Sequence, residues 1–112
     1  MNKKDKNQDL YKEAKKIIPG GVMLFSKRPE NHLPNKWPTY YKKAKGAFIW
    51  DLNNQKYLDM YFGVGQSILG YANSLVDNKV NKSNKLGNIT SLNSFYEVKL
   101  AKKLINIHKW AG

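Results

Sequence analysis

The stretch Tyr40–Asp59 most constrains the fold of this chain, because it contains three short runs separated by residues that suit tight turns. Phe48 and Trp50 alternate with the side chains at 47, 49 and 51, which is the period of a half-buried strand. Residues 56–60 alternate in the same way, and Tyr40 and Tyr41 can form a third strand. Lys45-Gly46 and Asn53-Asn54 lie between the runs and tolerate turn geometry. The stretch predicts a three-stranded antiparallel meander, which needs flanking helices because so small a sheet is only marginally stable alone.

A short helix is predicted before the meander. It begins at Asp9, with Asp9 or Asn7 as the cap, and it ends at Pro19-Gly20-Gly21. Its apolar residues recur at helical spacing, and they are Leu10, Ala14, Ile17 and Ile18. Residues 1–8 are polar and are expected to form a flexible tail. Residues 22–38 hold three prolines without a clear period and predict an ordered crossing loop.

Two helices are predicted after the meander. Ser94 and Glu97 form a capping box, which precedes an apolar stripe on a helix that runs toward His108. A weaker helix is indicated around Leu75, Val76 and Val80. The predicted fold class is therefore α+β: an N-terminal helix, a three-stranded antiparallel meander, then helices, within one segment that covers residues 9–112.

The net charge of +12 does not by itself indicate a nucleic-acid partner. Nineteen of the 20 basic residues are lysines scattered through every segment, and Arg28 is the one arginine, whereas nucleic-acid readers rely on arginine for bidentate contacts. A lysine- and asparagine-rich background is the favoured interpretation. We therefore expect no nucleic-acid partner and, without an apolar run of about 20 residues, no membrane partner. The absence of cysteine fits a cytoplasmic protein.

Residue patterns alone predict no catalytic residue and no metal site. His32 and His108 lie far apart and have no partner at metal-ligand spacing. Asp51 and Asp59 could pair across the hairpin, but acids at strand ends usually cap turns. Three glycines interrupt the apolar run 61–71, which is equally compatible with a ligand-lining loop and with close packing.

Several motifs in register resemble the opening of class III aminotransferases, which are pyridoxal-phosphate enzymes of fold type I. The order and spacing are most similar to the glutamate-1-semialdehyde 2,1-aminomutase branch, from about Leu10 to the last residue. The motifs are Ile17-Ile18-Pro19-Gly20-Gly21-Val22, Lys45-Gly46-Ala47-Phe48-Ile49-Trp50-Asp51-Leu52, Lys56-Tyr57-Leu58-Asp59-Met60 and Ile68-Leu69-Gly70-Tyr71-Ala72.

This resemblance implies an N-terminal segment that comprises the small-domain meander and the start of the large domain. The phosphate loop, the aspartate that pairs with the pyridine nitrogen and the Schiff-base lysine would follow later in the family. We therefore expect the 112-residue chain alone to be inactive and not to bind pyridoxal phosphate. The intact enzyme would be a homodimer that acts on a small-molecule amino donor and acceptor.

The resemblance also assigns a substrate-binding role to four consecutive residues: Gly63, Val64, Gly65 and Gln66. The aminomutase branch carries Ser-Trp where this chain has Gly63 and Val64. The loss of an aromatic wall leaves room for another amino donor or a keto-sugar. The alternative hypotheses are a non-catalytic interaction module from a truncated gene and, with less support, a basic nucleic-acid binder.

Overall fold

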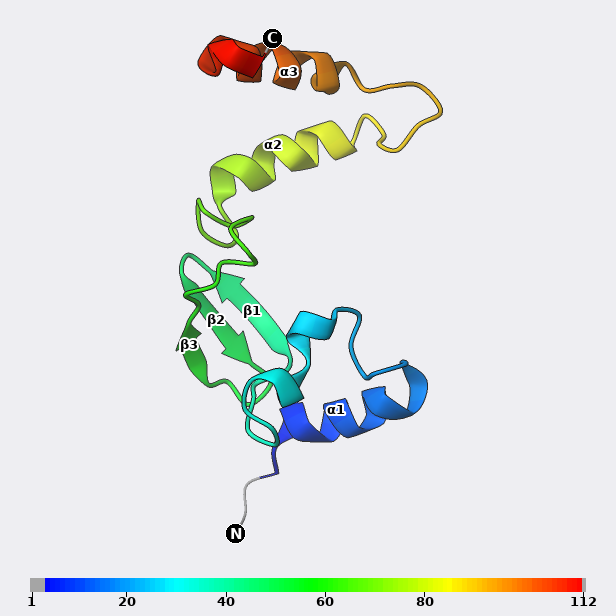
Figure 1. Cartoon of the computed structure of the whole chain (residues 1–112), viewed down its shortest axis with the longest axis vertical. Coiled ribbons are helices and arrows are strands. Elements are labelled where there is room, and N and C mark those ends of the chain that lie inside the picture. The colour runs from blue at the N-terminus through cyan, green and yellow to red at the C-terminus, as the bar shows by residue number, and fades with distance from the viewer. Residues whose placement is uncertain (1–3, 112) are drawn as a thin grey trace. The chain divides into compact units, whose positions relative to one another are not determined.

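The computed structural model describes residues 4–111, and Figure 1 shows their elements in chain order. The helices and strands are α1 (Lys6–Ile17), β1 (Tyr41–Lys45), β2 (Phe48–Asp51), β3 (Lys56–Leu58), α2 (Ser74–Asn84) and α3 (Phe95–Ile107). Short 3-10 turns cover Phe25–Lys27, Pro29–Asn31 and Lys109–Ala111. The chain divides into an N-terminal unit, Met1–Asp77, and a C-terminal unit, Asn78–Gly112. The predicted α+β order of a helix, a meander and further helices is confirmed.

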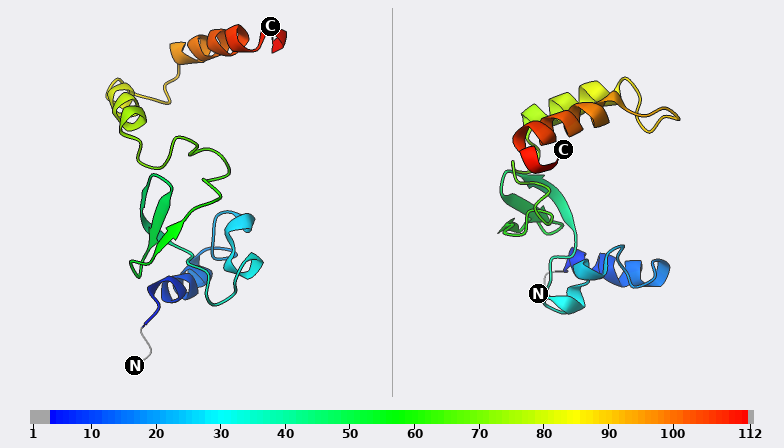
Figure 2. Two further views of the ribbon diagram at one scale, coloured as in Figure 1. Left: turned by 90° about the vertical axis from the view of Figure 1, so that its left-hand side faces the viewer. Right: turned by 45° about the horizontal axis from the view of Figure 1, so that its top comes forward.

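The meander is an antiparallel sheet with strand order β1-β2-β3, and the views in Figure 2 show its twist. Trp50 on β2 lies opposite Lys43 on β1 and Lys56 on β3, and the β1 register shifts between Tyr41 and Lys43. The two predicted turns are confirmed, because Gly46 (φ 57°) and Asn54 (φ 69°) both adopt left-handed backbone.

Helix α1 begins three residues before the predicted start. Asp5 is its N-cap, and the Asp5 side chain accepts hydrogen bonds from the amides of Asn7 and Gln8. The prediction of Asp9 or Asn7 as the cap was therefore wrong, and residues 6–8, expected in a flexible tail, form the first turn of the helix. Residues 1–3 of that expected tail lie outside the described residues. The C-terminal end is confirmed, since α1 stops at Ile17 before Pro19.

The segment 22–38 is an ordered loop, as predicted. Two 3-10 turns shape it, and the ring of His32 stacks on Trp37 with the centroids 4.2 Å apart. The His32 Nε2 also lies 2.9 Å from the carbonyl oxygen of Ser26. His32 therefore has a packing role in this loop.

Very little apolar side chain is buried in either unit. In the N-terminal unit the buried hydrophobic residues are Tyr11 and Ala14, both on α1, and the buried polar residues are Asn7 and Asp51. In the C-terminal unit no residue between 78 and 111 is buried.

The predicted capping box at Ser94 and Glu97 is present and starts α3. Across residues 4–111, none of the helices is both long enough and apolar enough to cross a membrane.

Candidate functional site

The loop from Asp59 to Tyr71, called the 59–71 loop below, leaves and returns to the same edge of the meander. The Asp59 amide donates to the carbonyl of Ala47 at 2.9 Å. Tyr71 and Gly46 exchange two backbone hydrogen bonds, each 2.9 Å long. Both ends of the loop are thus held at the β1–β2 turn, which is the closed form of a compact surface loop.

A run of left-handed backbone forms the first half of this loop. Phe62, Gly63, Val64 and Gly65 have φ angles of 47°, 57°, 62° and 82°. Glycine adopts this region at no steric cost, but a β-branched residue such as Val64 is an outlier there. Strained backbone of this kind persists only where the surroundings fix it, and such outliers cluster at functional sites. The conformation therefore singles out the loop as the candidate site.

The four predicted substrate-binding residues lie consecutively at this turn. Gly63, Val64, Gly65 and Gln66 are all exposed, and the Val64 side chain is 73% exposed. Ile68 and Leu69, further along the same loop, are also exposed. The structure brings the four residues together on one accessible turn, while their substrate-binding role stays a prediction.

One carboxylate organises both ends of the loop. The Asp59 Oδ1 accepts hydrogen bonds from the amides of Tyr61 and Phe62, at 2.8 and 3.2 Å. The Asp59 Oδ2 accepts the hydroxyl of Tyr71, and the rings of Phe62 and Tyr71 stack with their centroids 6.4 Å apart. We call the Asp59–Tyr71 hydrogen bond the clasp. It joins residues that are 12 positions apart in the sequence.

The clasp changes the pKa of both partners. The hydrogen bond to Asp59, with partial burial, raises the pKa of Tyr71 to about 12. Partial burial raises the pKa of Asp59, but hydrogen bonds from Tyr71 and the two backbone amides outweigh it, so the pKa falls below its usual value. Asp59 is therefore a carboxylate and Tyr71 a neutral phenol over the whole physiological range.

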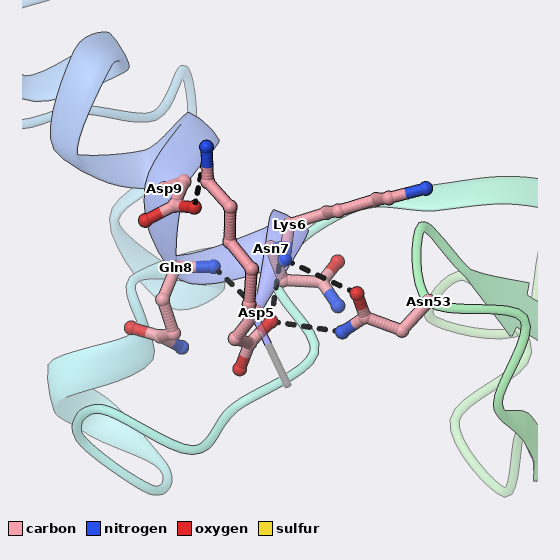
Figure 3. A network of polar contacts seen from close by, with 7 residues as sticks. Asp5, Lys6, Asn7, Gln8, Asp9 and Asn53 are labelled. Carbon is pink, nitrogen blue, oxygen red and sulfur yellow. Dashed lines mark hydrogen bonds and ion pairs between the residues drawn. The ribbon is translucent and has the colours of Figure 1, made fainter. Parts of the chain in front are cut away.

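A second polar cluster joins α1 to the β2–β3 turn, and Figure 3 shows its outer part. Asn53 donates from its side chain to Asp5 at 2.8 Å and accepts from the Lys6 amide at 3.1 Å. This Asn53 hydrogen bond is the main cause of a lowered Asp5 pKa; partial burial opposes it. Deeper in the cluster, the Asn7 side chain donates to the Asp51 Oδ2 at 2.9 Å, and both residues are buried.

Asp51 and Asp59 do not act as a pair. The Asp51 Oδ1 accepts the amides of Asn53 and Gln55, each at 2.8 Å, within its own turn. The interpretation that each acid caps a turn is confirmed. Sequence reasoning missed the long-range partners Asn7, Asp5 and Tyr71, for which the sequence gives no local signal because each lies far along the chain from the acid or amide it meets.

The described residues do not fit a pyridoxal-phosphate Schiff base. Such a lysine is activated by desolvation or by a neighbouring cation, yet every lysine between residues 4 and 111 is exposed. The same part of the chain holds no cluster of three metal-ligating side chains. The 59–71 loop itself contains no lysine, and what it offers a ligand is shape and hydrogen-bonding contacts.

Two glycine substitutions should separate backbone strain from close packing in the 59–71 loop. Gly65 (φ +82°) faces open space, so Gly65→Ala should cost about 1 kcal/mol from left-handed backbone alone. Gly70 (φ +86°) would place a Cβ 3.2 Å from the Gly46 Cα, so Gly70→Ala should cost roughly 2–3 kcal/mol. Urea unfolding of the N-terminal unit measures both. Gly87→Ala is the control, because Gly87 faces open space in the C-terminal unit and its change should leave the N-terminal unit as stable as before. Equal losses of stability at Gly65 and Gly70 would contradict the packing role of Gly70.

Comparisons with known proteins identify relatives for most of the chain. The glutamate-1-semialdehyde 2,1-aminomutase of Wigglesworthia glossinidia brevipalpis is 37% identical over 102 residues, which cover 91% of this chain and 23% of that enzyme. The 3-aminobutyryl-CoA aminotransferase of Cloacimonas acidaminovorans is 32% identical over 100 residues, covering 88% of this chain and 24% of that enzyme. No family model matches the chain.

A solved structure matches the fold as well. The pyridoxal-phosphate internal aldimine form of the Sphingopyxis sp. MTA144 FumI protein superimposes with a TM-score of 0.79 and 30% sequence identity. The match covers 89% of this chain and 24% of that one. The chain thus spans about a quarter of the length of the relatives it matches. The resemblance is confirmed: over most of its length the chain is similar to the N-terminal region of pyridoxal-phosphate-dependent aminotransferases and glutamate-1-semialdehyde 2,1-aminomutases.

Proposed function

We propose that this chain is the N-terminal portion of a pyridoxal-phosphate-dependent class III aminotransferase or aminomutase, which moves an amino group between small molecules. The observation that carries the proposal is the similarity in both sequence and fold over about nine tenths of the chain. In such an enzyme the cofactor supplies an electron sink for proton movement at the substrate carbon. The residues described here would contribute shape and contacts around it.

The contribution of the 59–71 loop would be part of a substrate wall at Gly63–Gln66. The left-handed run presents its backbone and the Val64 side chain outward, and no aromatic side chain stands at Gly63 or Val64. A wall of this kind leaves room for a substrate bulkier than glutamate semialdehyde. Another amino donor or a keto-sugar is the substrate class that fits.

The intact enzyme would be a cytoplasmic homodimer. The support is the apolar surface of each unit, taken by itself. On α3, Leu100, Leu104 and Ile107 share one face at helical spacing and are 46–62% exposed, although the helix is well capped. Amphipathic helices bury such faces in stable proteins, so a further part of the enzyme or a second subunit would cover this one.

The cofactor test uses the 112-residue chain with added pyridoxal phosphate. We expect no internal-aldimine absorption band, and borohydride should fix the cofactor to no single lysine, because all described lysines are exposed. A band that reduction traces to one lysine would contradict this expectation.

The test of the whole proposal is the reading frame downstream of the codon for Gly112. We expect it to encode a phosphate-binding loop and a Schiff-base lysine, and the protein made from that frame should form the aldimine and exchange amino groups. A frame that stops without them would favour the alternative, an interaction module that binds a partner through the same exposed apolar faces.

A further inference from the structure

We propose that Asp59 and Tyr71 are positioning residues, which fix the conformation of the Gly63–Gln66 turn through the clasp. This inference rests on the proposed function, in which that turn forms part of a substrate wall. Neither residue would contact the reacting atoms. Their role would be to hold a strained turn in one shape, so that the wall is formed before a substrate arrives.

The two oxygens of the Asp59 carboxylate bind opposite ends of the loop. The Asp59 Oδ1 accepts hydrogen bonds from the amides of Tyr61 and Phe62, at the start of the loop. The Oδ2 accepts a hydrogen bond from the hydroxyl of Tyr71, at its end. A single ionised group thus ties the start of the loop to its end. Hydrogen bonds to a charged acceptor are stronger than neutral ones, which makes this link the strongest polar contact of the loop.

Tyr71, the other partner of the clasp, is fixed to the β1–β2 turn. Tyr71 is held by its two backbone hydrogen bonds to Gly46, and Gly70 lies so close to Gly46 that an added Cβ would stand 3.2 Å from the Gly46 Cα. The Tyr71 hydroxyl is therefore fixed relative to the β1–β2 turn. Through the clasp, Asp59 is also held in place, and so are the two amides that donate hydrogen bonds to it.

Backbone hydrogen bonds connect the clasp to the strained turn. The Val64 amide donates to the carbonyl of Tyr61 at 2.9 Å, and the Ser67 amide donates to that of Phe62 at 3.2 Å. Tyr61 and Phe62 are the two residues whose amides Asp59 holds. When this anchor is lost, Val64 can leave its left-handed conformation for the extended region that β-branched residues prefer, and the turn changes shape.

The clasp also predicts how the loop responds to alkaline pH. The pKa of Tyr71 in the folded chain, about 12, lies above the value of 10.0 for a free tyrosine. The clasp therefore contributes its full stability below about pH 10, and the contribution is lost as the pH rises through 12. Above that pH two anions face each other, and the loop should open.

The experiment measures amide hydrogen exchange, residue by residue, on the isotopically labelled 112-residue chain. In Asp59→Ala the amides of Tyr61, Phe62 and Val64 should exchange roughly tenfold faster than in the parent, because the hydrogen-bond acceptor at the start of the loop is lost. Asp59→Asn keeps the size of the side chain and one acceptor oxygen, so these amides should keep most of their protection from exchange. In Tyr71→Phe the same amides should exchange several-fold faster, and the tyrosine that titrates near pH 12 should disappear.

The matched control is Tyr61→Phe, which removes a phenol from a side chain that is 68% exposed and leaves the Tyr61 amide in place. It should change neither the exchange rates of the loop amides nor the titration of Tyr71 near pH 12. Unchanged loop exchange in Tyr71→Phe and Asp59→Ala, with the β2–β3 register intact, would overturn the inference. If Asp59→Ala also disrupts the sheet, the comparison of Tyr71→Phe with Tyr61→Phe decides alone. A reading frame without the cofactor site would sink the proposed function but leave these rates as they are, so the two failures are distinguishable.

Discussion

Replacing Asp51 by alanine should detach α1 from the meander and destabilise the N-terminal unit by about 3 kcal/mol. Asp51 is 4% exposed and accepts hydrogen bonds from the side chain of Asn7, from the amides of Asn53 and Gln55, and from the hydroxyl of Tyr57. The change leaves these donors without their acceptor, and the Asn7 amide group is itself buried. A loss of this size is a large fraction of the stability of a small domain, so the urea midpoint of the unit should fall well below that of the parent.

Urea unfolding, followed through the resonances of α1 and of the β2–β3 turn, measures this effect. Asn7→Ala removes one of the donors and should cost less, about 1–2 kcal/mol. In the double variant the two losses should not add, because the residues share one hydrogen bond. Asp77→Ala, which removes an exposed acid from the first turn of α2, is the control. An Asp51→Ala protein within 0.5 kcal/mol of the parent would show that α1 is held by other contacts.

The sequence predicted the meander and α3 well, for physical reasons that act over a few residues. Gly46 and Asn54 are the residues that can adopt left-handed backbone at the required positions, so both turns could be located from composition and spacing. The capping box at Ser94 and Glu97 is likewise a local exchange of hydrogen bonds. The start of α1 was missed because residues 6–8 are polar and carry no apolar period. Their helix is fixed by Asp5 and by Asn53, which lies 48 residues from Asp5.

The candidate site shows the same division between local and long-range causes. The glycines at 63, 65 and 70 indicated an unusual backbone in the 59–71 loop, and the structure shows the left-handed run there. The clasp could not be predicted, because nothing in the sequence states that Tyr71 returns to Asp59. The same holds for Asn7 and Asp51, which are 44 residues apart. Aspartates that looked like simple turn caps in the sequence are also the points where distant segments meet.

The exposed apolar surface of the chain has the largest consequence for its behaviour in solution. Tyr11 and Ala14 are its buried hydrophobic residues among those described, whereas Met23, Leu58, Ile68 and Leu86 are all more than half exposed. Two such side chains supply only a small share of the hydrophobic stabilisation with which a chain of this length normally offsets the conformational entropy of folding. Exposed apolar patches of more than a few hundred Å² mark lost or intended interfaces. The chain matches about a quarter of each relative, which leaves most of the relatives' length to supply such interfaces.

We therefore expect the 112-residue chain alone to be loosely packed or self-associating, with its secondary structure formed locally. Sedimentation should show species larger than a monomer or a broad distribution, and the near-ultraviolet dichroism should be weak. Trp37, Trp50 and Trp110 report on packing, and Trp110 is 84% exposed. Far-ultraviolet dichroism should nevertheless retain the helical signal, because the capping contacts of α1 and α3 are local. A monodisperse monomer with strong aromatic signals would contradict this expectation. That result would show a domain that is stable by itself, and it would favour an interaction module over a portion of a larger enzyme.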